Sequence, residues 1–245
     1  MKTPRALILG GTTEATALCR AMAEAGIAGT ISFAGRVARP VRQPLPQRVG
    51  GFGGVAGLVA YLRDNRITHL IDATHPFAAQ MSTHAVAAAA EAGVPLLALT
   101  RPPWVPQLGD EWTLVPDLDG AVQALEGSRR RIMLAIGRMH LDLFARHPQH
   151  FYLLRLVDPP EAPLPVPDAH VEVSRGPFTQ EDDGTLMERH RIDLIVSKNA
   201  GGTGARAKID AARALGLPVV MIDRPALPPR PEVHDVAAAL EWLRT

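Results

Sequence analysis

The sequence predicts an α/β protein built from two Rossmann-like parallel-sheet halves, with the active site in the cleft between them. Short apolar runs alternate with helical patterns from the N-terminus to about residue 100, and repeated βα units of this kind form parallel sheets with right-handed crossovers. The first unit turns on two adjacent glycines, Gly10 and Gly11. A second series of strands and helices follows a proline-rich stretch at residues 101–106. We therefore expect two domains, residues 1–101 and 102–245.

In the first domain, each expected strand is an apolar run and each expected helix has apolar residues at helical spacing. The first helix has Ala15, Leu18 and Met22 on one face, and Gly26 can end it. The remaining helices are expected at 55–62 and 77–92, and the strands at 6–9, 29–34, 67–73 and 94–100. The prolines at residues 102–106 fit neither a helix interior nor an inner strand, so they mark the boundary.

The second domain repeats the alternation of strands and helices less regularly. Residues 158–167 hold five prolines and are expected to form a surface excursion. Helices are expected at 118–125 and 203–215, and Asp235 caps a last one. The strands are expected at 111–115, 131–136, 151–157, 170–174, 192–196 and 219–223.

Composition excludes several classes of function. Charged residues make up 21% of the chain and the net charge is +1, which argues against a general nucleic-acid binder. The apolar run near the N-terminus is broken by Gly10 and Gly11, so it is neither a signal peptide nor a membrane span. The only cysteine is Cys19, and the nine histidines include no H-E-x-x-H motif. We expect a soluble cytoplasmic protein without a metal site.

The turn at Gly10–Glu14 predicts a phosphate-binding site. Glycine lets the backbone approach a ligand closely, and the free N–H groups at a helix start attract phosphate. Thr12 stands where the second glycine of the dinucleotide fingerprint would be, and Ala15 occupies the tolerated third position. An ordinary α/β turn remains the alternative.

The region after the second strand favours NADP(H) over NAD(H). In NAD-binding units an acidic residue about 20 positions after the glycines binds the ribose hydroxyls, but no Asp or Glu occurs between Glu24 and Asp64. Arg36 and Arg39 lie there instead, and a guanidinium can bind a 2′-phosphate through two hydrogen bonds. The alternative is that these arginines belong to a solvated loop.

Two more strand ends carry polar residues in patterns that suit a ligand. The first reads Asp72-Ala73-Thr74-His75-Pro76-Phe77-Ala78, and the second reads Ser197-Lys198-Asn199-Ala200-Gly201-Gly202. Open α/β sheets bind ligands outside the carboxyl ends of their strands. An ammonium and an amide before a glycine-rich turn into a helix suit an anion.

Together these segments resemble the precorrin-6A reductase family of cobalamin biosynthesis. The resemblance rests on GGT-x-EA at residues 10–15, DATHPFA at 72–78 and SKNAGG at 197–202, in order across nearly the whole chain. Phe77 stands where a tyrosine would be expected, which puts one hydroxyl contact in doubt. The resemblance implies NADPH-dependent reduction of a ring double bond of precorrin-6A to give precorrin-6B.

The segments and the resemblance together name the candidate site residues. Those expected to bind the cofactor are Gly10, Gly11, Thr12, Thr13, Glu14, Arg36, Asp72, Ala73, Thr74, Asn199, Gly201 and Gly202. Cations at strand ends suit a tetrapyrrole with many carboxylates, and these are Lys198, Arg101, Arg138, Arg155 and Arg175; ordinary surface charge is the alternative for each. His75 is the candidate proton donor, although it could instead shape the turn or contact the cofactor.

Two other functions stay open on the sequence. One is another NADP-dependent reductase that acts on a smaller acid, which would need only one or two basic residues. The other is a non-catalytic nucleotide-sensing module, which would have no hydride-accepting pocket beside the nicotinamide.

Overall fold

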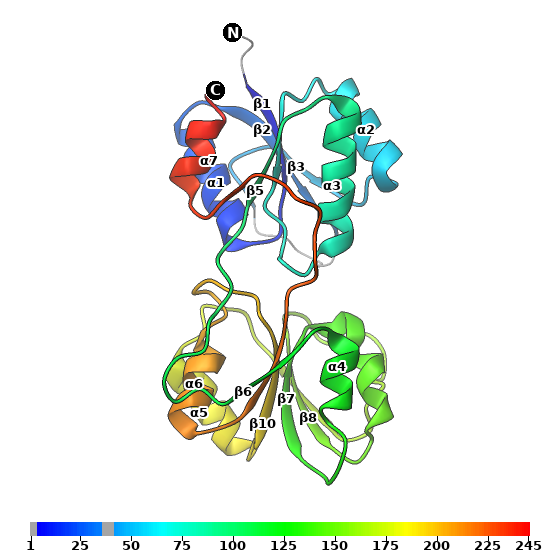
Figure 1. Cartoon of the computed structure of the whole chain (residues 1–245), viewed down its shortest axis with the longest axis vertical. Coiled ribbons are helices and arrows are strands. Elements are labelled where there is room, and N and C mark those ends of the chain that lie inside the picture. Colours follow the sequence, from blue (N-terminus) through cyan, green and yellow to red (C-terminus); the bar gives the residue numbers. More distant parts are fainter. Residues whose placement is uncertain (1–3, 36–41) are drawn as a thin grey trace. The chain divides into compact units, whose positions relative to one another are not determined.

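The computed structural model of the chain describes residues 4–35 and 42–245. The chain divides into two compact units, shown in Figure 1. Unit 1 contains the chain up to Pro102 together with Ala226–Thr245, and unit 2 is the continuous stretch Pro103–Pro225. No helix in the described ranges has the length and apolar character that a membrane crossing requires.

The sheet of unit 1 is parallel, with the strand order typical of dinucleotide-binding folds. Its order is β12-β5-β4-β1-β2-β3, and all its strand pairs are parallel. The order reverses between β1 and β4, and such a reversal is where this fold binds ligands. The strands are β1 (Arg5–Leu9), β2 (Ala28–Phe33), β3 (Gln47–Val49), β4 (His69–Asp72), β5 (Leu96–Leu99) and β12 (Glu232–Val233).

Helices cover both faces of this sheet (Figure 1). On one face, α1 (Thr13–Glu24) packs against α7 (Val236–Trp242) over a core that includes Leu18, Met22 and Ile31. On the other face, α2 (Gly54–Asp64) packs against α3 (Ala79–Ala92). Because both faces are covered, the central strands are almost continuously apolar, as expected for a parallel sheet.

Unit 2 holds a second parallel sheet with a similar reversal. Its order is β6-β11-β10-β7-β8-β9, so the switch lies between β7 and β10. The strands are β6 (Trp112–Val115), β7 (Arg131–Ala135), β8 (Phe151–Leu156), β9 (Ala169–Val173), β10 (Leu194–Lys198) and β11 (Val219–Ile222). The helical segments are α4 (Leu118–Gln123), the 3₁₀ segment η1 (Arg138–Arg146), α5 (Gln180–Arg189) and α6 (Ala207–Leu215). The prediction of two parallel-sheet halves is confirmed.

The predicted boundary of the second domain is wrong at its C-terminal end. Residues 226–245 do not stay with residues 102–225 but return to unit 1. There β12 pairs with β5, and the backbone N–H of Ala98 donates to the carbonyl of Pro231 at 2.9 Å. Ala239 and Leu243 are buried in the unit 1 core. The reason is that β5 would otherwise be an open edge and α1 would expose its apolar face.

Some element boundaries also differ from the prediction. The strands β3 and β12 and the helix α5 lie in segments for which the sequence patterns predicted no regular element. Helix α6 begins at Ala207 instead of residue 203, because Gly202 has a left-handed backbone (φ 68°) and turns follow it. Helix α3 begins at Ala79, two residues after the predicted start.

Candidate active site

The glycine turn lies directly after β1, at the switch point of unit 1. The N–H of Gly10 donates to the carbonyl of Ser32 at 2.9 Å, which continues the pairing of β1 with β2. A Cβ at Gly10 would lie 2.7 Å from Cδ1 of Ile31, so the close packing of the strands requires glycine there. Gly11 has φ +129°, and a Cβ there would meet no described atom within 4 Å. Its backbone therefore faces open space.

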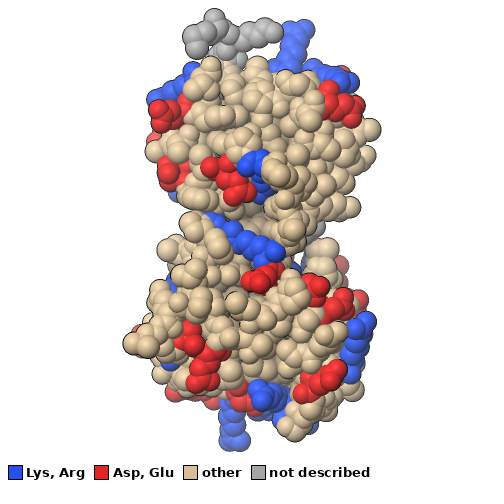
Figure 2. All heavy atoms as spheres, viewed as in Figure 1, with Lys and Arg blue, Asp and Glu red and all other residues tan. Residues whose placement is uncertain are grey.

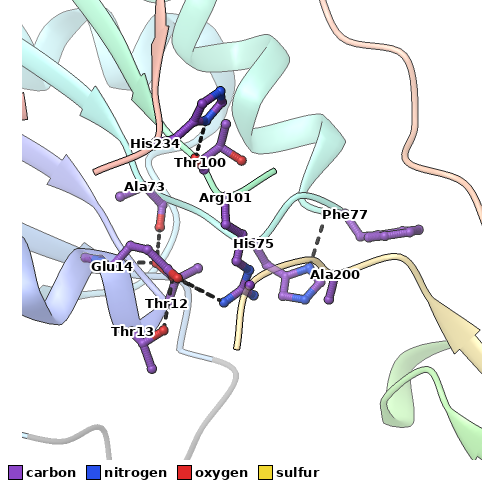
Figure 3. Close-up of polar contacts among 12 residues, drawn as sticks. Thr12, Thr13, Glu14, Ala73, His75, Phe77, Thr100, Arg101, Ala200 and His234 are labelled. Carbon is purple, nitrogen blue, oxygen red and sulfur yellow. Dashed lines mark hydrogen bonds and ion pairs between the residues drawn. The ribbon is translucent and has the colours of Figure 1, made fainter. Parts of the chain in front are cut away.

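Thr12 joins the ends of β1 and β4 (Figure 3). Its hydroxyl caps α1 by accepting a hydrogen bond from the N–H of Ala15 at 3.1 Å, and it donates to the carbonyl of Ala73 at 2.8 Å. The N–H of Ala73 in turn donates to the carbonyl of Leu9 at 2.9 Å. The two strand ends on either side of the switch point are thus held together beside the N-terminus of α1.

An ion pair closes the side of this turn. Glu14, in the first turn of α1, accepts from Arg101 at 3.2 Å, as Figure 3 shows. The hydroxyl of Thr13 donates to the same carboxylate at 3.1 Å. The side chains of Arg101 and Glu14 are 11% and 22% exposed, so Arg101 offsets a negative charge that would otherwise repel phosphate at the helix start.

Asp72 ends β4 with both carboxylate oxygens engaged. One oxygen accepts from the N–H of Thr74 at 3.1 Å and from its hydroxyl at 2.7 Å, which shapes a tight turn. The other forms an ion pair with Arg230. Asp72 was predicted to bind the cofactor, and that role stays a prediction; within unit 1 its carboxylate makes contacts that shape the turn.

His75 follows this turn, and its ring contacts the backbone ahead of it (Figure 3). Its Nδ1 accepts from the N–H of Phe77 at 3.2 Å, and its carbonyl accepts from Ala78 at 2.7 Å. A ring nitrogen that accepts a hydrogen bond carries no proton, so the proton of the neutral ring lies on Nε2. The rings of His75 and Phe77 are 5.9 Å apart.

A cation from the neighbouring strand β3 lies at the end of β2, and no Asp or Glu is near this end in the sequence. Arg48, in β3, donates to the hydroxyl of Ser32 at 2.7 Å and to the carbonyl of Gly50 at 3.0 Å. Its guanidinium lies 3.8 Å from the ring centre of Phe52. Arg36, predicted to bind the 2′-phosphate, lies outside the described residues, as does Arg39.

At the switch point of unit 2, an ammonium reaches across two strand ends. Lys198 ends β10, and its Nζ donates to the carbonyl of Ile136, just after β7, at 3.0 Å. Gly137 and Arg138 follow directly and are exposed. Lys198 and Arg138 were both predicted to bind substrate carboxylates, and the structure places both at this switch point.

The turn after β10 is held by Trp104. The side-chain amide of Asn199 accepts from the backbone N–H of Trp104 at 2.7 Å and donates to its carbonyl at 2.9 Å. The indole N–H of Trp104 donates to the carbonyl of Gly202 at 2.7 Å. Arg224 donates to the carbonyls of Asn199 and Ala200 at 3.0 and 3.1 Å. Gly201 and Gly202 both have φ 68°, which glycine tolerates best.

Three of the predicted substrate cations are already in ion pairs. Arg101 pairs with Glu14, as described above. Arg155 pairs with Asp183, which is 1% exposed, and Arg175 with Asp158 at 2.8 Å. These three roles stay predictions, but each of these charges has an acidic partner within its own unit.

The sequence patterns did not single out four of the residues that shape these turns. They are Arg48, Trp104, Arg224 and Arg230. All but Arg48 lie in proline-rich connections that have no strand or helix periodicity, and their partners are distant in the sequence. The only available signal was the presence of large side chains among prolines, which by itself indicates no particular contact.

The residues whose pKa values are shifted lie away from these turns. Burial raises the pKa of Cys19 to about 11 and that of Tyr152 to about 12. Burial also lowers the pKa of His69 and, with nearby positive charges, that of His190. Across residues 4–35 and 42–245, no group of three His, Cys, Asp or Glu side chains is placed to hold a metal ion.

Comparisons with known proteins agree with the geometry of the two switch points. The model of the family described as "Precorrin-6x reductase CbiJ/CobK" matches residues 5–244. The chain is 58% identical to the precorrin-6A reductase of Rhodobacter capsulatus over 98% of its own length and 95% of that protein. It is 50% identical to the precorrin-6A reductase of a Sinorhizobium species over 91% of this chain and 86% of that one.

A solved structure shows the same fold across the chain. The structure titled "CobK precorrin-6A reductase" matches with a TM-score of 0.95 and 56% identity, covering 98% of this chain and 96% of the other. Two parallel sheets with a glycine turn at one switch point, and sequence similarity from end to end, agree on one assignment. The chain belongs to the precorrin-6A reductase family.

Proposed function

We propose that the protein reduces a ring double bond of precorrin-6A to give precorrin-6B, with NADPH as the reductant. The observation that carries the proposal is that each of the two sheets has a hydrogen-bonded polar turn at its switch point, in a chain of this family. The turn in unit 1 suits a dinucleotide and the turn in unit 2 carries cations for a polycarboxylate. Relatives named precorrin-6A reductase at 50–58% identity support the substrate.

The residues of unit 1 fit a dinucleotide phosphate. A Cβ at Gly11 would meet no described atom within 4 Å, and α1 begins two residues later, so the N-terminus of a helix lies beside this open position. Thr12 holds this turn against Ala73 at a fixed spacing. A pyrophosphate would therefore lie at the switch point, with one mononucleotide on the side of β2 and the other on the side of β4.

The preference for NADPH over NADH is supported by the end of β2. Arg48 is fixed there by Ser32 and the ring of Phe52. In NAD-binding proteins this position has a carboxylate, which would repel a 2′-phosphate. Arg48 is partly exposed, so we propose that it contributes positive charge near the 2′-phosphate together with Arg36.

The substrate is a large ring that bears many carboxylates, and we propose that Lys198 and Arg138 bind some of them. On the face shown in Figure 2, acidic and basic side chains are mixed across each unit. On this face, recognition would thus depend on a few placed cations and not on a broad basic surface. Lys198 is held by Ile136 in a defined position, which reduces the entropy lost when it binds an anion.

The chemistry requires one hydride and one proton. When bound, NADPH would supply the hydride for one carbon of the double bond, and the neighbouring carbon would take a proton. Nδ1 of His75 accepts from the N–H of Phe77, so the proton of the neutral ring lies on Nε2. We propose contact with the cofactor as its main role, with protonation by His75 as the alternative.

The cofactor is tested by thermal stabilisation of the purified protein with NADPH and with NADH. A ligand that binds the native state raises stability by RT ln(1 + [L]/Kd), so NADPH should raise the melting temperature more than NADH at equal concentration. The variants Arg36→Ala and Arg48→Ala should weaken NADPH binding and leave NADH binding nearly unchanged. Equal weakening of both nucleotides would contradict the 2′-phosphate assignment.

The substrate site is tested by turnover of precorrin-6A. Lys198→Ala should lower kcat/KM for the tetrapyrrole with little change in NADPH affinity, and Arg129→Ala is the control because Arg129 is an exposed cation paired with Asp168 that has no predicted site role. If Lys198→Ala reduces turnover no more than Arg129→Ala, Lys198 does not bind substrate. His75→Ala should retain near-normal single-turnover hydride transfer if its role is contact with the cofactor, whereas a loss of roughly 10²–10⁴-fold would identify the proton donor.

A further inference from the structure

Arg230 is a buried arginine in the segment that returns from unit 2 to unit 1. Its side chain is 6% exposed and forms an ion pair with Asp72, which is 1% exposed. It also contacts Glu232 at 3.3 Å, but that side chain is 42% exposed. Asp72 is therefore the buried partner of Arg230, whereas Glu232 is a partly exposed one. A buried pair of this kind is a weak source of stability in itself, since desolvation offsets the attraction.

The other contacts of Asp72 indicate the role of its ion pair with Arg230. The second carboxylate oxygen of Asp72 accepts two hydrogen bonds from Thr74, one from its N–H and one from its hydroxyl. That hydroxyl lies 3.4 Å from the hydroxyl of Ser82 in α3. With one oxygen directed to Arg230, the carboxylate has one orientation, and that orientation sets the turn from Ala73 to His75.

The turn that Asp72 shapes follows β4, on the opposite side of the switch point from β2. In dinucleotide-binding folds the residue at the end of the second strand contacts the adenosine ribose, and in this chain that end carries Ser32 and Arg48. A nicotinamide mononucleotide would then lie across the switch point, on the side of β4 and of the turn that Asp72 shapes.

We propose that Arg230 is a positioning residue for the reduction, which fixes through Asp72 the turn Ala73–His75 where it meets the nicotinamide end of NADPH. The inference rests on the proposed function. The side chain of Arg230 is 6% exposed and paired with Asp72, so the proposal gives it no direct contact with either reactant. Its effect is on geometry, and a shift of about 1 Å at a reacting centre can cost on the order of 10²-fold in rate.

The test separates the two halves of the cofactor. In Arg230→Met, kcat for precorrin-6A and the single-turnover rate of hydride transfer should fall about 10- to 100-fold. Affinity for 2′,5′-ADP, which carries only the adenosine half, should stay within about twofold of wild type, since the end of β2 is untouched. Arg230→Lys should recover only part of the rate, because an ammonium lacks the planar fork of the guanidinium.

Two further variants keep the result interpretable. Arg213→Met removes a guanidinium from Asp110, which is also 1% exposed, but in unit 2 and away from both switch points; turnover should stay near the wild-type value. Arg230→Met combined with Asp72→Asn removes both charges, so it should fold at least as well as the single variant and still turn over slowly.

Three outcomes would overturn the inference. The first is normal single-turnover hydride transfer in a folded Arg230→Met. The second is a parallel loss of 2′,5′-ADP affinity, which would indicate a general defect of unit 1. The third is a wild-type rate in the double variant that combines Arg230→Met with Asp72→Asn. The unpaired charge of Asp72 would then account for the whole loss of rate in Arg230→Met. If the wild-type protein itself fails to bind 2′,5′-ADP, the proposed cofactor is wrong, and the inference falls with it.

Discussion

At the scale of single residues, the two glycines after β1 are needed for different physical reasons. Gly10 is in close contact with Ile31 of the neighbouring strand, so its requirement is one of packing. Gly11 has room for a side chain but a backbone conformation, φ +129°, that other residues rarely adopt. Gly10 allows the close packing of the sheet, and Gly11 shapes the surface that a phosphate would approach.

Substitutions at these positions should therefore separate stability from binding. Gly10→Ala should lower the free energy of unfolding by about 1–3 kcal/mol, the usual cost of overpacking a core. Gly11→Val should leave the fold intact and abolish NADPH binding. Chemical denaturation and NADPH titration of both variants check this, and normal NADPH affinity in folded Gly11→Val would show that the phosphates bind elsewhere.

His69 should make unit 1 sensitive to acid. Burial lowers its pKa below the ordinary value near 6.5, so the unfolded chain takes up a proton more readily than the folded one. The stability that this contributes is present above about pH 6.5 and is lost as the pH falls through the folded-state pKa. His69→Gln should show a smaller loss of melting temperature between about pH 7 and 5. An unchanged slope would argue against the assignment.

At the scale of elements, the turn after β10 depends on a segment 95 residues earlier in the chain. Asn199 is 6% exposed and uses both ends of its amide on the backbone of Trp104. It was predicted to bind the cofactor. In the structure it instead fixes the turn that carries Lys198 and Gly202, and a cofactor contact stays untested.

An aspartate at position 199 tests this role. Asn199→Asp keeps an acceptor for the N–H of Trp104 but removes the donor to its carbonyl, and it buries a charge. The free energy of unfolding of unit 2 should fall by about 1–3 kcal/mol, the usual cost of a buried unsatisfied group. Thr203→Ala, in the same turn but exposed, is the control. Equal unfolding midpoints for the two variants would contradict the role.

The elements that the sequence revealed are those with strong local patterns. The apolar runs of β1, β4, β7 and β10 and the glycine turns were readable because burial on both faces forces continuous apolar strands. Helix α5 was missed because its first turn holds Glu181, Asp182 and Asp183, which hides the short apolar stripe. Strand β12 has only two residues, too few for any periodicity.

The contacts that shape the candidate site were the least predictable part. Arg230 and Asp72 are 158 residues apart, and Trp104 meets Asn199 from within a proline-rich connection. No periodic pattern encodes such pairings, because each depends on where the complete sheet places its edges. The glycines, His75 and Lys198 could be read from strand ends, whereas the side chains that hold them in place could not.

At the scale of the whole molecule, the chain contributes its last twenty residues to the unit in which it began. Unit 2 is one continuous stretch with its own sheet and core. Unit 1 is completed only by Ala226–Thr245, which supply the edge strand β12, the buried Ala239 and Leu243, and Arg230. The two units thus differ in their dependence on the full chain.

Fragments should display this difference. Residues 103–225 expressed alone should unfold cooperatively, whereas residues 1–102 alone should lack a sharp unfolding transition. Addition of a peptide of residues 226–245 to the 1–102 fragment should restore such a transition, and a peptide with Arg230→Met and Leu243→Ala should do so less well. Circular dichroism during thermal unfolding provides the measurement. A cooperative transition of 1–102 without the peptide would refute the expected dependence.

The returning C-terminal segment also sets the order in which the protein can fold while it is being synthesised. Domains usually fold in the order of synthesis, beginning at the N-terminus. Here unit 1 is begun first but is completed only after unit 2, because β12 and α7 follow the whole of unit 2 in the chain. During that interval β5 is an unpaired sheet edge, open to other strands. Unit 2 can complete its sheet in the meantime, so a nascent chain exposes this edge until β12 has been synthesised, and chaperones that shield strand edges matter most at that stage.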